Sequence, residues 1–289
     1  MSSARPTFSM TPRSPRLTLP PLSCNAHCHI FGPAATFPYA VPRDAAPADA
    51  PKDVFLALQR HLGLDRAVIV QTLNHGYDHA AAIETIQADP DNHRGIALVP
   101  LDVADAELAR LNAHGFRGAR FHLTHTMPGT ETIDDIVRFG DRLARFGWHL
   151  QLHINGEQIP GCAAAIHRSA VPVVIDHMAY PDASAGLDQP GFIALRRLLE
   201  DENVWVKISG CDRATRAGPP YTDTIPFVQS LVAQAGDRAV WGTDWPHTKL
   251  DGPIPDDGLL VDLLGDMVPD PAERHRVLVD NPGQLYGFP

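Results

Sequence analysis

The chain alternates short apolar runs with longer amphipathic segments, and this alternation limits the folds open to it more than any other feature. Short runs rich in β-branched residues are typical of buried parallel strands, and amphipathic segments between them are typical of helices that cover such a sheet. We expect strands over residues 24–31, 66–71, 95–101, 118–123, 149–154, 172–177, 204–210 and 239–244. We expect helices over residues 52–62, 105–114, 133–146, 189–202, 223–235 and 272–279. This pattern predicts an α/β fold, a single (β/α)8 TIM barrel, with the active site at the C-terminal ends of the strands.

The length of 289 residues suits a single barrel of this kind, so we expect one barrel domain over residues 23–289. Residues 1–22 contain three arginines, no acidic residue and no long apolar core, unlike a secretion signal. We expect them to form a flexible N-terminal arm that packs on the barrel or on a neighbouring subunit. No glycine-rich phosphate loop follows the first apolar run, which argues against a dinucleotide-binding sheet.

Charge and cysteine content exclude several classes of partner. The 24 basic and 34 acidic residues leave a formal net charge of −10, so the chain lacks the basic surface that nucleic acids and anionic membranes require. No apolar run reaches the length of a transmembrane helix, about 18 residues. The four cysteines show neither a paired framework nor a metal-binding spacing, which is typical of a reducing cytoplasm. We therefore expect a cytoplasmic monomer or small homo-oligomer without nucleic-acid or membrane partners.

Reactive side chains gather near the ends of the predicted strands. His27 and His29 share one face of the first strand, because side chains alternate between the two faces of a strand. Two imidazoles at this spacing can bind one metal ion. His153, His177 and Asp244 end the fifth, sixth and eighth strands, so a closed barrel would bring them to the same end.

Each of these residues has a structural alternative. Asp244 fits a general base or a carboxylate ligand opposite the histidines, but an aspartate there can also cap a short helix. His177 is either an active-site residue or a histidine whose hydrogen bonds are satisfied within the core. His153 is either a metal ligand or a substrate contact.

Two arginines point to an acidic substrate. Arg120 lies inside an apolar strand, and a buried guanidinium requires an anionic partner, which is either a substrate carboxylate or a structural acid. Arg213 lies in the loop after the seventh strand. Further candidate substrate contacts near strand ends are Asn74, His75 and His122. Together these residues predict a small acidic organic substrate.

Longer motifs extend this pattern: AHCHIFGP at 26–33, FPY at 37–39, IDHM at 175–178, GPP at 218–220, WGTDWPH at 241–247, IPDDG at 254–258 and NPGQLYG at 281–287. On these residues, the stretch from about 23 to 286 resembles the amidohydrolase superfamily, and more narrowly its amidohydrolase-2 branch, which contains lactone hydrolases. The resemblance implies a lactonase, a hydrolase of cyclic carboxylic esters. Its substrate would be an aromatic-catabolism intermediate, similar to 2-pyrone-4,6-dicarboxylate or a muconolactone, or else a sugar lactone.

The resemblance also implies roles for single residues. Asp244 would activate the hydrolytic water, and His27, His29 and His177 would surround the scissile carbonyl, with His177 bonded to the developing oxyanion. Arg120 and Arg213 would hold substrate carboxylates. Three positions depart from the pyrone-dicarboxylate lactonases of this branch, which carry an arginine near Thr126, a tyrosine at His153 and a tyrosine near Ala45. One cationic contact fewer implies an acid with fewer carboxylates or a different anion.

The departure at His153 bears on the metal. The pyrone lactonases work without a metal, whereas metal-dependent members of the superfamily use a set that this chain supplies as His27, His29, His153 and Asp244. No lysine on the fourth strand is available to bridge a second ion. The resemblance therefore implies a single divalent ion, with Zn²⁺ preferred over Mn²⁺, while a metal-free mechanism stays open.

Two further functions stay open. The same metal set could serve a non-hydrolytic decarboxylase of an aromatic or semialdehyde acid, which release of carbon dioxide would reveal. The barrel could also bind an acidic metabolite without turnover, in which case ligand would stabilise the protein and no product would form.

Overall fold

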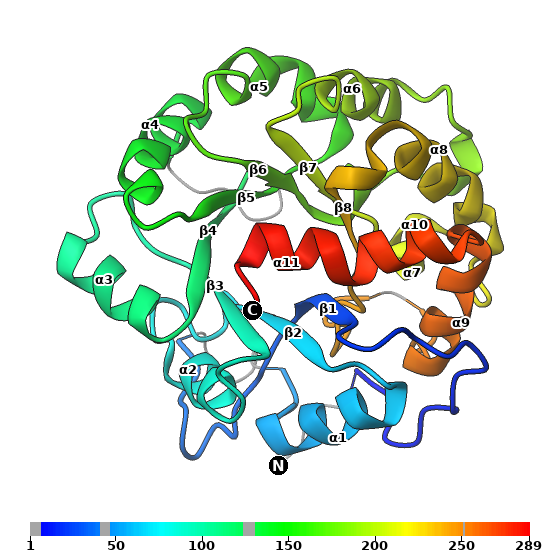
Figure 1. Cartoon of the computed structure of the whole chain (residues 1–289), viewed down its shortest axis with the longest axis horizontal. Helices are drawn as coiled ribbons and strands as arrows, with labels where there is room; N and C mark the ends of the chain where they lie inside the picture. The colour runs from blue at the N-terminus through cyan, green and yellow to red at the C-terminus, as the bar shows by residue number, and fades with distance from the viewer. Residues whose placement is uncertain (1–6, 41–46, 124–130, 251) are drawn as a thin grey trace.

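The computed structural model describes residues 7–40, 47–123, 131–250 and 252–289 of the chain. Within these residues, eight parallel strands form one sheet in which sequence neighbours are also sheet neighbours (Figure 1). The strands are β1 (Cys24–Cys28), β2 (Arg66–Val70), β3 (His93–Ala97), β4 (Phe116–His122), β5 (His149–His153), β6 (Val173–Ile175), β7 (Val204–Lys207) and β8 (Ala239–Val240). Helices stand between successive strands, which confirms the predicted (β/α)8 barrel.

The barrel closes between β1 and the segment that follows β8. The amide of Ala26 donates to the carbonyl oxygen of Trp241 at 2.8 Å, and the amide of Asp244 donates to that of His27 at 2.9 Å. Gly242 makes this approach feasible, because a Cβ atom at this position would lie 2.5 Å from the backbone nitrogen of His27. The strand predicted over 239–244 ends at Val240. The WGTDWPH motif at 241–247 follows as irregular chain and closes the barrel against β1.

The helices are α1 (Lys52–Leu62), α2 (Ala80–Gln87), α3 (Asp105–Ala113), α4 (Ile133–Ala144), α5 (Ile159–Ile166), α6 (Pro190–Leu198), α7 (Cys211–Ala214), α8 (Ile225–Ala235), α9 (Asp257–Met267), α10 (Pro271–His275) and α11 (Asn281–Tyr286). The predicted helix over 52–62 coincides with α1, and Gly63 ends it in the left-handed conformation. The predicted helix over 272–279 is instead α10 followed by a π-helical stretch, Arg276–Asp280. Helices α2, α5, α7, α9 and α11 lie outside the predicted helical segments. The apolar composition of α5, for example, gives little polar–apolar alternation to recognise.

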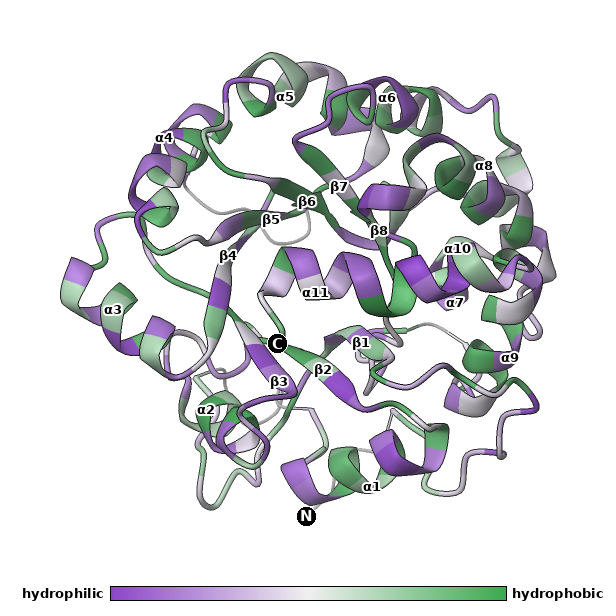
Figure 2. Cartoon of the chain, viewed as in Figure 1, coloured by the Kyte–Doolittle hydropathy of each residue, from purple (hydrophilic) through white to green (hydrophobic). Residues whose placement is uncertain are grey.

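Two apolar clusters hold the layers together. The outer cluster lies between strands and helices and includes Ile69, Phe116 and Leu195. The inner cluster lies inside the barrel and includes Val68, Val174 and Tyr286. Figure 2 shows the same arrangement, with strands such as β6 and β7 strongly hydrophobic and the surrounding helices carrying both hydrophobic and hydrophilic residues.

Helix α11 lies across one end of the barrel, as seen in Figure 1. The ring of Phe288, just beyond α11, lies between the guanidinium carbons of Arg66 and Arg94, 5.0 and 4.8 Å from its centre. These arginines lie in β2 and β3, so the C-terminal residues cover the amino ends of the strands.

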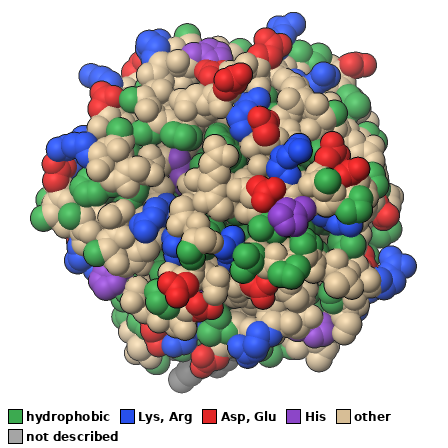
Figure 3. All heavy atoms as spheres, viewed as in Figure 1, with side chains coloured by type: hydrophobic (Ala, Val, Ile, Leu, Met, Phe, Trp, Pro, Cys, Tyr) green, Lys and Arg blue, Asp and Glu red, His purple; other side chains and the backbone are tan. Residues whose placement is uncertain are grey.

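The described part of the N-terminal arm lies against α9 and α1. The Asp262 carboxylate accepts hydrogen bonds from the backbone amides of Arg16 and Leu17 at 2.6 and 3.0 Å, and Asp256 accepts one from Arg13 at 3.0 Å. No helix among the described residues is both long enough and apolar enough to cross a membrane. Acidic and basic side chains are interspersed over the face of the molecule shown in Figure 3.

Candidate active site

The carboxyl ends of the strands enclose a cavity of about 210 Å³. Most of the predicted site residues line it, namely His29, Asn74, His122, Arg120, His153, His177, Arg213 and Asp244. His27 is fully buried immediately behind His29. His75 lies deeper in the loop after β2, where its Nε2 accepts a hydrogen bond from the amide of Gly32 at 3.1 Å. The structure therefore brings the predicted residues to one end of the barrel, with His75 holding a loop beside the cavity.

A β-bulge in β1 aims both histidines at the barrel interior. Asn25 pairs with Ala67 of β2. The next pair is Cys28 with Ile69, so β1 contains one residue more than β2 over this stretch. The extra residue reverses the regular alternation of side chains. Cys28 consequently packs in the outer cluster, on the opposite side from the two histidines, as predicted.

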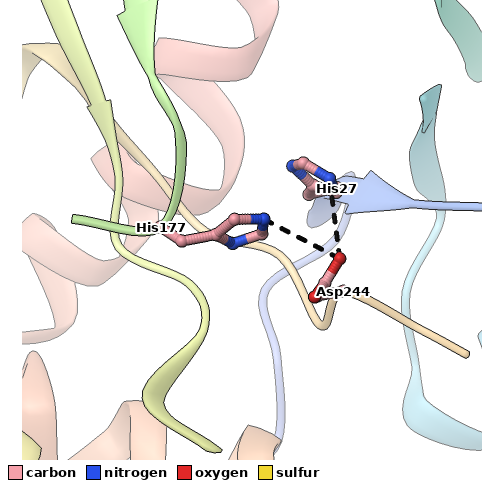
Figure 4. A group of neighbouring side chains, drawn as sticks. All are labelled: His27, His177 and Asp244. Carbon is pink, nitrogen blue, oxygen red and sulfur yellow. Dashed lines mark ion pairs between the residues drawn. The ribbon is translucent and has the colours of Figure 1, made fainter. Parts of the chain in front are cut away.

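Three histidine nitrogens surround one oxygen of Asp244. Its Oδ1 lies 3.2 Å from Nε2 of His29, 3.6 Å from Nε2 of His27 and 3.8 Å from Nε2 of His177. Figure 4 shows His27 and His177 converging on this carboxylate from β1 and from the segment after β6. Ligand atoms of His27, His177 and Asp244 all lie within 4.8 Å of one another, a grouping that can hold a metal ion.

The other carboxylate oxygen of Asp244 is held by Arg213. The Nε atom of Arg213 lies 2.7 Å from Oδ2 of Asp244. Burial alone would raise the pKa of Asp244, but the charge of Arg213 outweighs it and, with His177, keeps the pKa well below its usual range. Among the described residues no helix starts at Asp244, so its side chain is an ion-pair partner rather than a helix cap.

Arg120 has a structural acid as its partner. Its Nε donates to Oδ2 of the fully buried Asp176 at 2.8 Å, and its Nη2 donates to Nδ1 of His153 at 2.9 Å. Burial would raise the pKa of Asp176, but Arg120 and His27 keep it well below the usual value. Arg120 was predicted to pair with a substrate carboxylate or with a structural acid, and the structure contains the structural acid, Asp176. Arg120 also lines the cavity.

His153 belongs to an aromatic and cationic group on the wall of the cavity. Its ring centre lies 4.9 Å from those of His122 and Tyr180. Burial, followed by the charge of Arg120, lowers the pKa of His153 to about 3, so the ring is neutral. Because Arg120 can only donate, Nδ1 of His153 accepts and its proton resides on Nε2. In this state His153 is a hydrogen-bond donor.

The side chain of His177 is held in place by Ser209. Its Nδ1 lies 2.8 Å from the hydroxyl oxygen of Ser209, and its backbone has the left-handed φ of 49°. Gly210 leaves room for this ring, since a Cβ atom there would lie 2.9 Å from the Cβ of His177. His177 resembles a core histidine in that its ring is almost fully buried. It also lines the cavity, as an active-site residue would.

Sequence reasoning missed three residues that shape the site: Asp176, Tyr180 and Lys207. Asp176 and Tyr180 lie within or beside the IDHM motif, where only His177 was singled out. Lys207 is the charged residue in an apolar strand, the same signal that identified Arg120. Asp257, within the IPDDG motif, is fully buried, and its carboxylate lies 3.1 Å from Nε2 of His247. The predicted differences at Ala45 and Thr126 lie outside the described residues.

Comparison with known proteins gives a consistent result. A family model described as Amidohydrolase matches residues 24–288. The chain is 37% identical to 2-pyrone-4,6-dicarboxylate hydrolase of Comamonas testosteroni over 284 residues, covering 95% of this chain and 93% of the relative. It is 35% identical to 4-sulfomuconolactone hydrolase of Rhizobium radiobacter over 273 residues, covering 93% and 91%.

Solved structures agree with these sequence matches. A structure from Pseudomonas putida, assigned as a 2-pyrone-4,6-dicarboxylic acid hydrolase, superimposes with a TM-score of 0.80 at 29% identity, covering 93% of this chain and 99% of that one. One from Acinetobacter baumannii with the same assignment and bound citric acid gives 0.78 at 25% identity, covering 92% and 100%. Through its barrel, its strand-end residues and these relatives, the chain belongs to the amidohydrolase family.

Proposed function

We propose that this protein hydrolyses the lactone ring of a small molecule that carries a carboxylate or a comparable anion. The observation that carries the proposal is the position of Asp244 at the base of the cavity, ionised by Arg213 and with Oδ1 turned toward three histidines. The relatives named for pyrone-dicarboxylate and sulfomuconolactone hydrolysis support the lactone as substrate class. Bound citric acid in the relative from Acinetobacter baumannii supports an acidic ligand.

In the reaction, Asp244 accepts a proton from water while the water oxygen adds to the lactone carbonyl carbon. His177 then donates a hydrogen bond to the oxyanion that develops on the carbonyl oxygen. The ring C–O bond breaks, and Asp244 returns the proton to the leaving oxygen. The products are a free carboxylate and a hydroxyl group on one open chain.

Substrate anions are held by basic and polar side chains that line the cavity. Arg120 and Arg213 supply guanidinium groups, although each already has an internal carboxylate partner. His122 and Asn74 add polar contacts, and burial lowers the pKa of His122 to about 2, so it binds as a neutral ring. Because both arginines are partly engaged, this cavity suits an acid with fewer carboxylates than pyrone dicarboxylate, or another single anion.

The positions of three donor atoms fit a divalent ion. Two ligand atoms on one zinc ion at tetrahedral angles stand roughly 3.4 Å apart. Nε2 of His27 and Nε2 of His29 are 3.3 Å apart, and both lie 3.2–3.6 Å from Oδ1 of Asp244. These residues would hold Zn²⁺ in preference to Mn²⁺, with His177 adjacent, and the ion would lower the pKa of water. His153 completes the predicted set, but its bond from Arg120 favours its alternative role as a substrate donor.

The proposal is tested by incubating the purified protein with 2-pyrone-4,6-dicarboxylate, 4-sulfomuconolactone and L-fucono-1,5-lactone and following the products by mass spectrometry. We expect the mass of at least one lactone to rise by one water. Elemental mass spectrometry of the same sample measures zinc and manganese. Loss of carbon dioxide would identify a decarboxylase, and ligand-induced stabilisation without turnover of any acidic lactone would identify a binding protein.

A further inference from the structure

Lys207 is a fully buried cation below the histidine pair. It ends β7, and its Nζ donates to Oε1 of Gln151 at 2.8 Å and to the carbonyl oxygen of Ala26 at 3.0 Å. The third neighbour of Nζ is Nδ1 of His27, at 3.2 Å. An ammonium group has three N–H donors and no acceptor, so these three neighbours match its three protons.

The other end of the histidine pair is fixed by a carbonyl group. Nδ1 of His29 lies 2.7 Å from the carbonyl oxygen of Val70. A carbonyl oxygen can only accept, so Nδ1 of His29 carries the proton. Nε2 of His29 faces two groups, Nε2 of His27 at 3.3 Å and Oδ1 of Asp244 at 3.2 Å.

Lys207 and Val70 fix the hydrogen bonds at the two ends of the histidine pair. Lys207 donates to Nδ1 of His27, so the proton of neutral His27 resides on Nε2. That proton lies on the side of Nε2 of His29, 3.3 Å away, and of Oδ1 of Asp244, 3.6 Å away, while His29 donates from Nδ1 to Val70. The assignment rests on the ammonium group of Lys207, which can only donate, and on the carbonyl oxygen of Val70, which can only accept.

The opposite tautomer of His27 fits less well. A proton on Nδ1 would face the ammonium group of Lys207 at 3.2 Å, donor against donor. The alternative acceptor, Oδ1 of Asp176, lies 3.4 Å from Nδ1 and forms an ion pair with Nζ of Lys207 at 3.8 Å, and in the described part of the chain this buried oxygen has no closer hydrogen-bond partner. The carboxylate of Asp176 is thus available to accept from His27 once the lysine is removed.

We propose that Lys207 is a positioning residue that fixes the proton of His27 on Nε2 and thereby weakens the affinity of the histidine pair for a divalent metal ion. A metal held by the histidine pair needs the lone pair on Nε2 of His27, but in this tautomer that nitrogen carries the proton. The inference rests on the proposed function, because it concerns metal binding at the same site. It does not depend on which lactone is the substrate.

The test compares Zn²⁺ binding to metal-free wild type and variants in competition with a chromophoric chelator. Lys207→Met keeps the length of the side chain and removes the ammonium, so His27 can move its proton to Nδ1, facing Asp176. We expect Lys207→Met to bind Zn²⁺ about tenfold more tightly or better. The gain should vanish in the double variant Lys207→Met/His29→Ala. The matched control is Lys52→Met, which removes a lysine paired with Glu84 on the surface and should bind as wild type. Equal affinity of wild type and Lys207→Met would overturn the proposal.

A second measurement needs no variant at Lys207, whose loss leaves buried acceptors unpaired. In a two-bond ¹⁵N–¹H correlation spectrum of metal-free wild type, His27 should show the pattern of the Nε2–H tautomer, with its signals assigned by their absence in His27→Asn. The Nδ1–H pattern would contradict the proposal. Neither measurement uses a substrate, so failure of the lactonase assay and failure of this inference are separate results.

Discussion

The two carboxylate oxygens of Asp244 face different partners. Oδ2 is held by Arg213, while Oδ1 faces the histidine nitrogens. This division gives the residue a fixed orientation and a permanent negative charge, because Arg213 outweighs the effect of burial on its pKa. Such a base stays ionised to a lower pH than an ordinary aspartate does.

Replacing Asp244 by asparagine therefore tests the base without changing the shape of the residue. We expect kcat for the lactone to fall by about 10²–10⁴, the usual contribution of a general base, while the far-UV circular dichroism spectrum is unchanged. Asp270→Asn is the matched control, since Asp270 caps the exposed start of α10 and asparagine caps equally well. Its kcat should equal that of wild type. Near-normal turnover by Asp244→Asn would remove Asp244 from the mechanism.

Among single residues, the sequence identified those with chemistry but could not name their partners. Arg120 was singled out because an arginine in an apolar strand demands an anion, and in the structure it lines the cavity. Its actual partner, Asp176, is 56 positions away, and only the register of β4 against β5 and β6 brings the two together. Lys207 carried the same signal and was overlooked.

At the scale of elements, all eight strands were predicted in the right places, yet most were predicted too long. The predicted strand over 172–177 ends at Ile175, where the backbone enters left-handed turns at His177 and Met178. Nothing in the side-chain pattern marks such a turn, because none of its left-handed residues is a glycine or an asparagine, the residues that favour this conformation. The bulge in β1 was equally invisible, since the register against β2 depends on contacts between distant segments.

Three elements beside the site are joined by His247. This fully buried imidazole lies 3.1 Å from the Asp257 carboxylate of α9 and 3.6 Å from that of Asp212 in α7. Burial alone would lower its pKa, but Asp257 and Asp212 outweigh burial and raise the pKa to about 10. The cation ties α7, the segment after β8 and α9 together, next to Arg213 and Asp244.

This cluster predicts a pH-dependent stability. The folded pKa lies above the unfolded value near 6.5, so the contribution of His247 is complete below about pH 6.5 and is lost as pH rises through about 10. We expect His247→Gln to lower Tm by roughly 5–10 °C at pH 6, and by clearly less at pH 10, in differential scanning calorimetry. The exposed pair of His167 with Asp201 supplies the control, and His167→Gln should shift Tm by less than about 2 °C at either pH. A Tm difference independent of pH would show that His247 is not charged.

On the scale of the whole molecule, the two ends of the barrel have separate tasks. The carboxyl ends of the strands hold the cavity, whereas the amino ends are covered by α11 and by Phe288 between two arginines. Substitutions at the covered end should therefore change stability and leave the chemistry intact.

Phe288→Ala tests this separation. Loss of the ring removes buried apolar surface and two cation–π contacts, so we expect the free energy of unfolding to fall by roughly 2–4 kcal/mol in urea denaturation. At 25 °C, kcat/KM for the lactone should stay within about twofold of wild type. Ile254→Ala, a truncation at a side chain that is 51% exposed, should leave the free energy of unfolding nearly unchanged. A large loss of kcat/KM in folded Phe288→Ala would show that the two ends are coupled.

The extra residue in β1 also bears on how the gene for this chain can change. A substitution at Ala26 alters one side chain, but the deletion of its codon would remove the bulge and with it the backbone amide and carbonyl through which Ala26 bonds to Trp241 and Lys207. Loops of a barrel absorb insertions and deletions with little effect. In this strand, the number of residues matters independently of which residues they are.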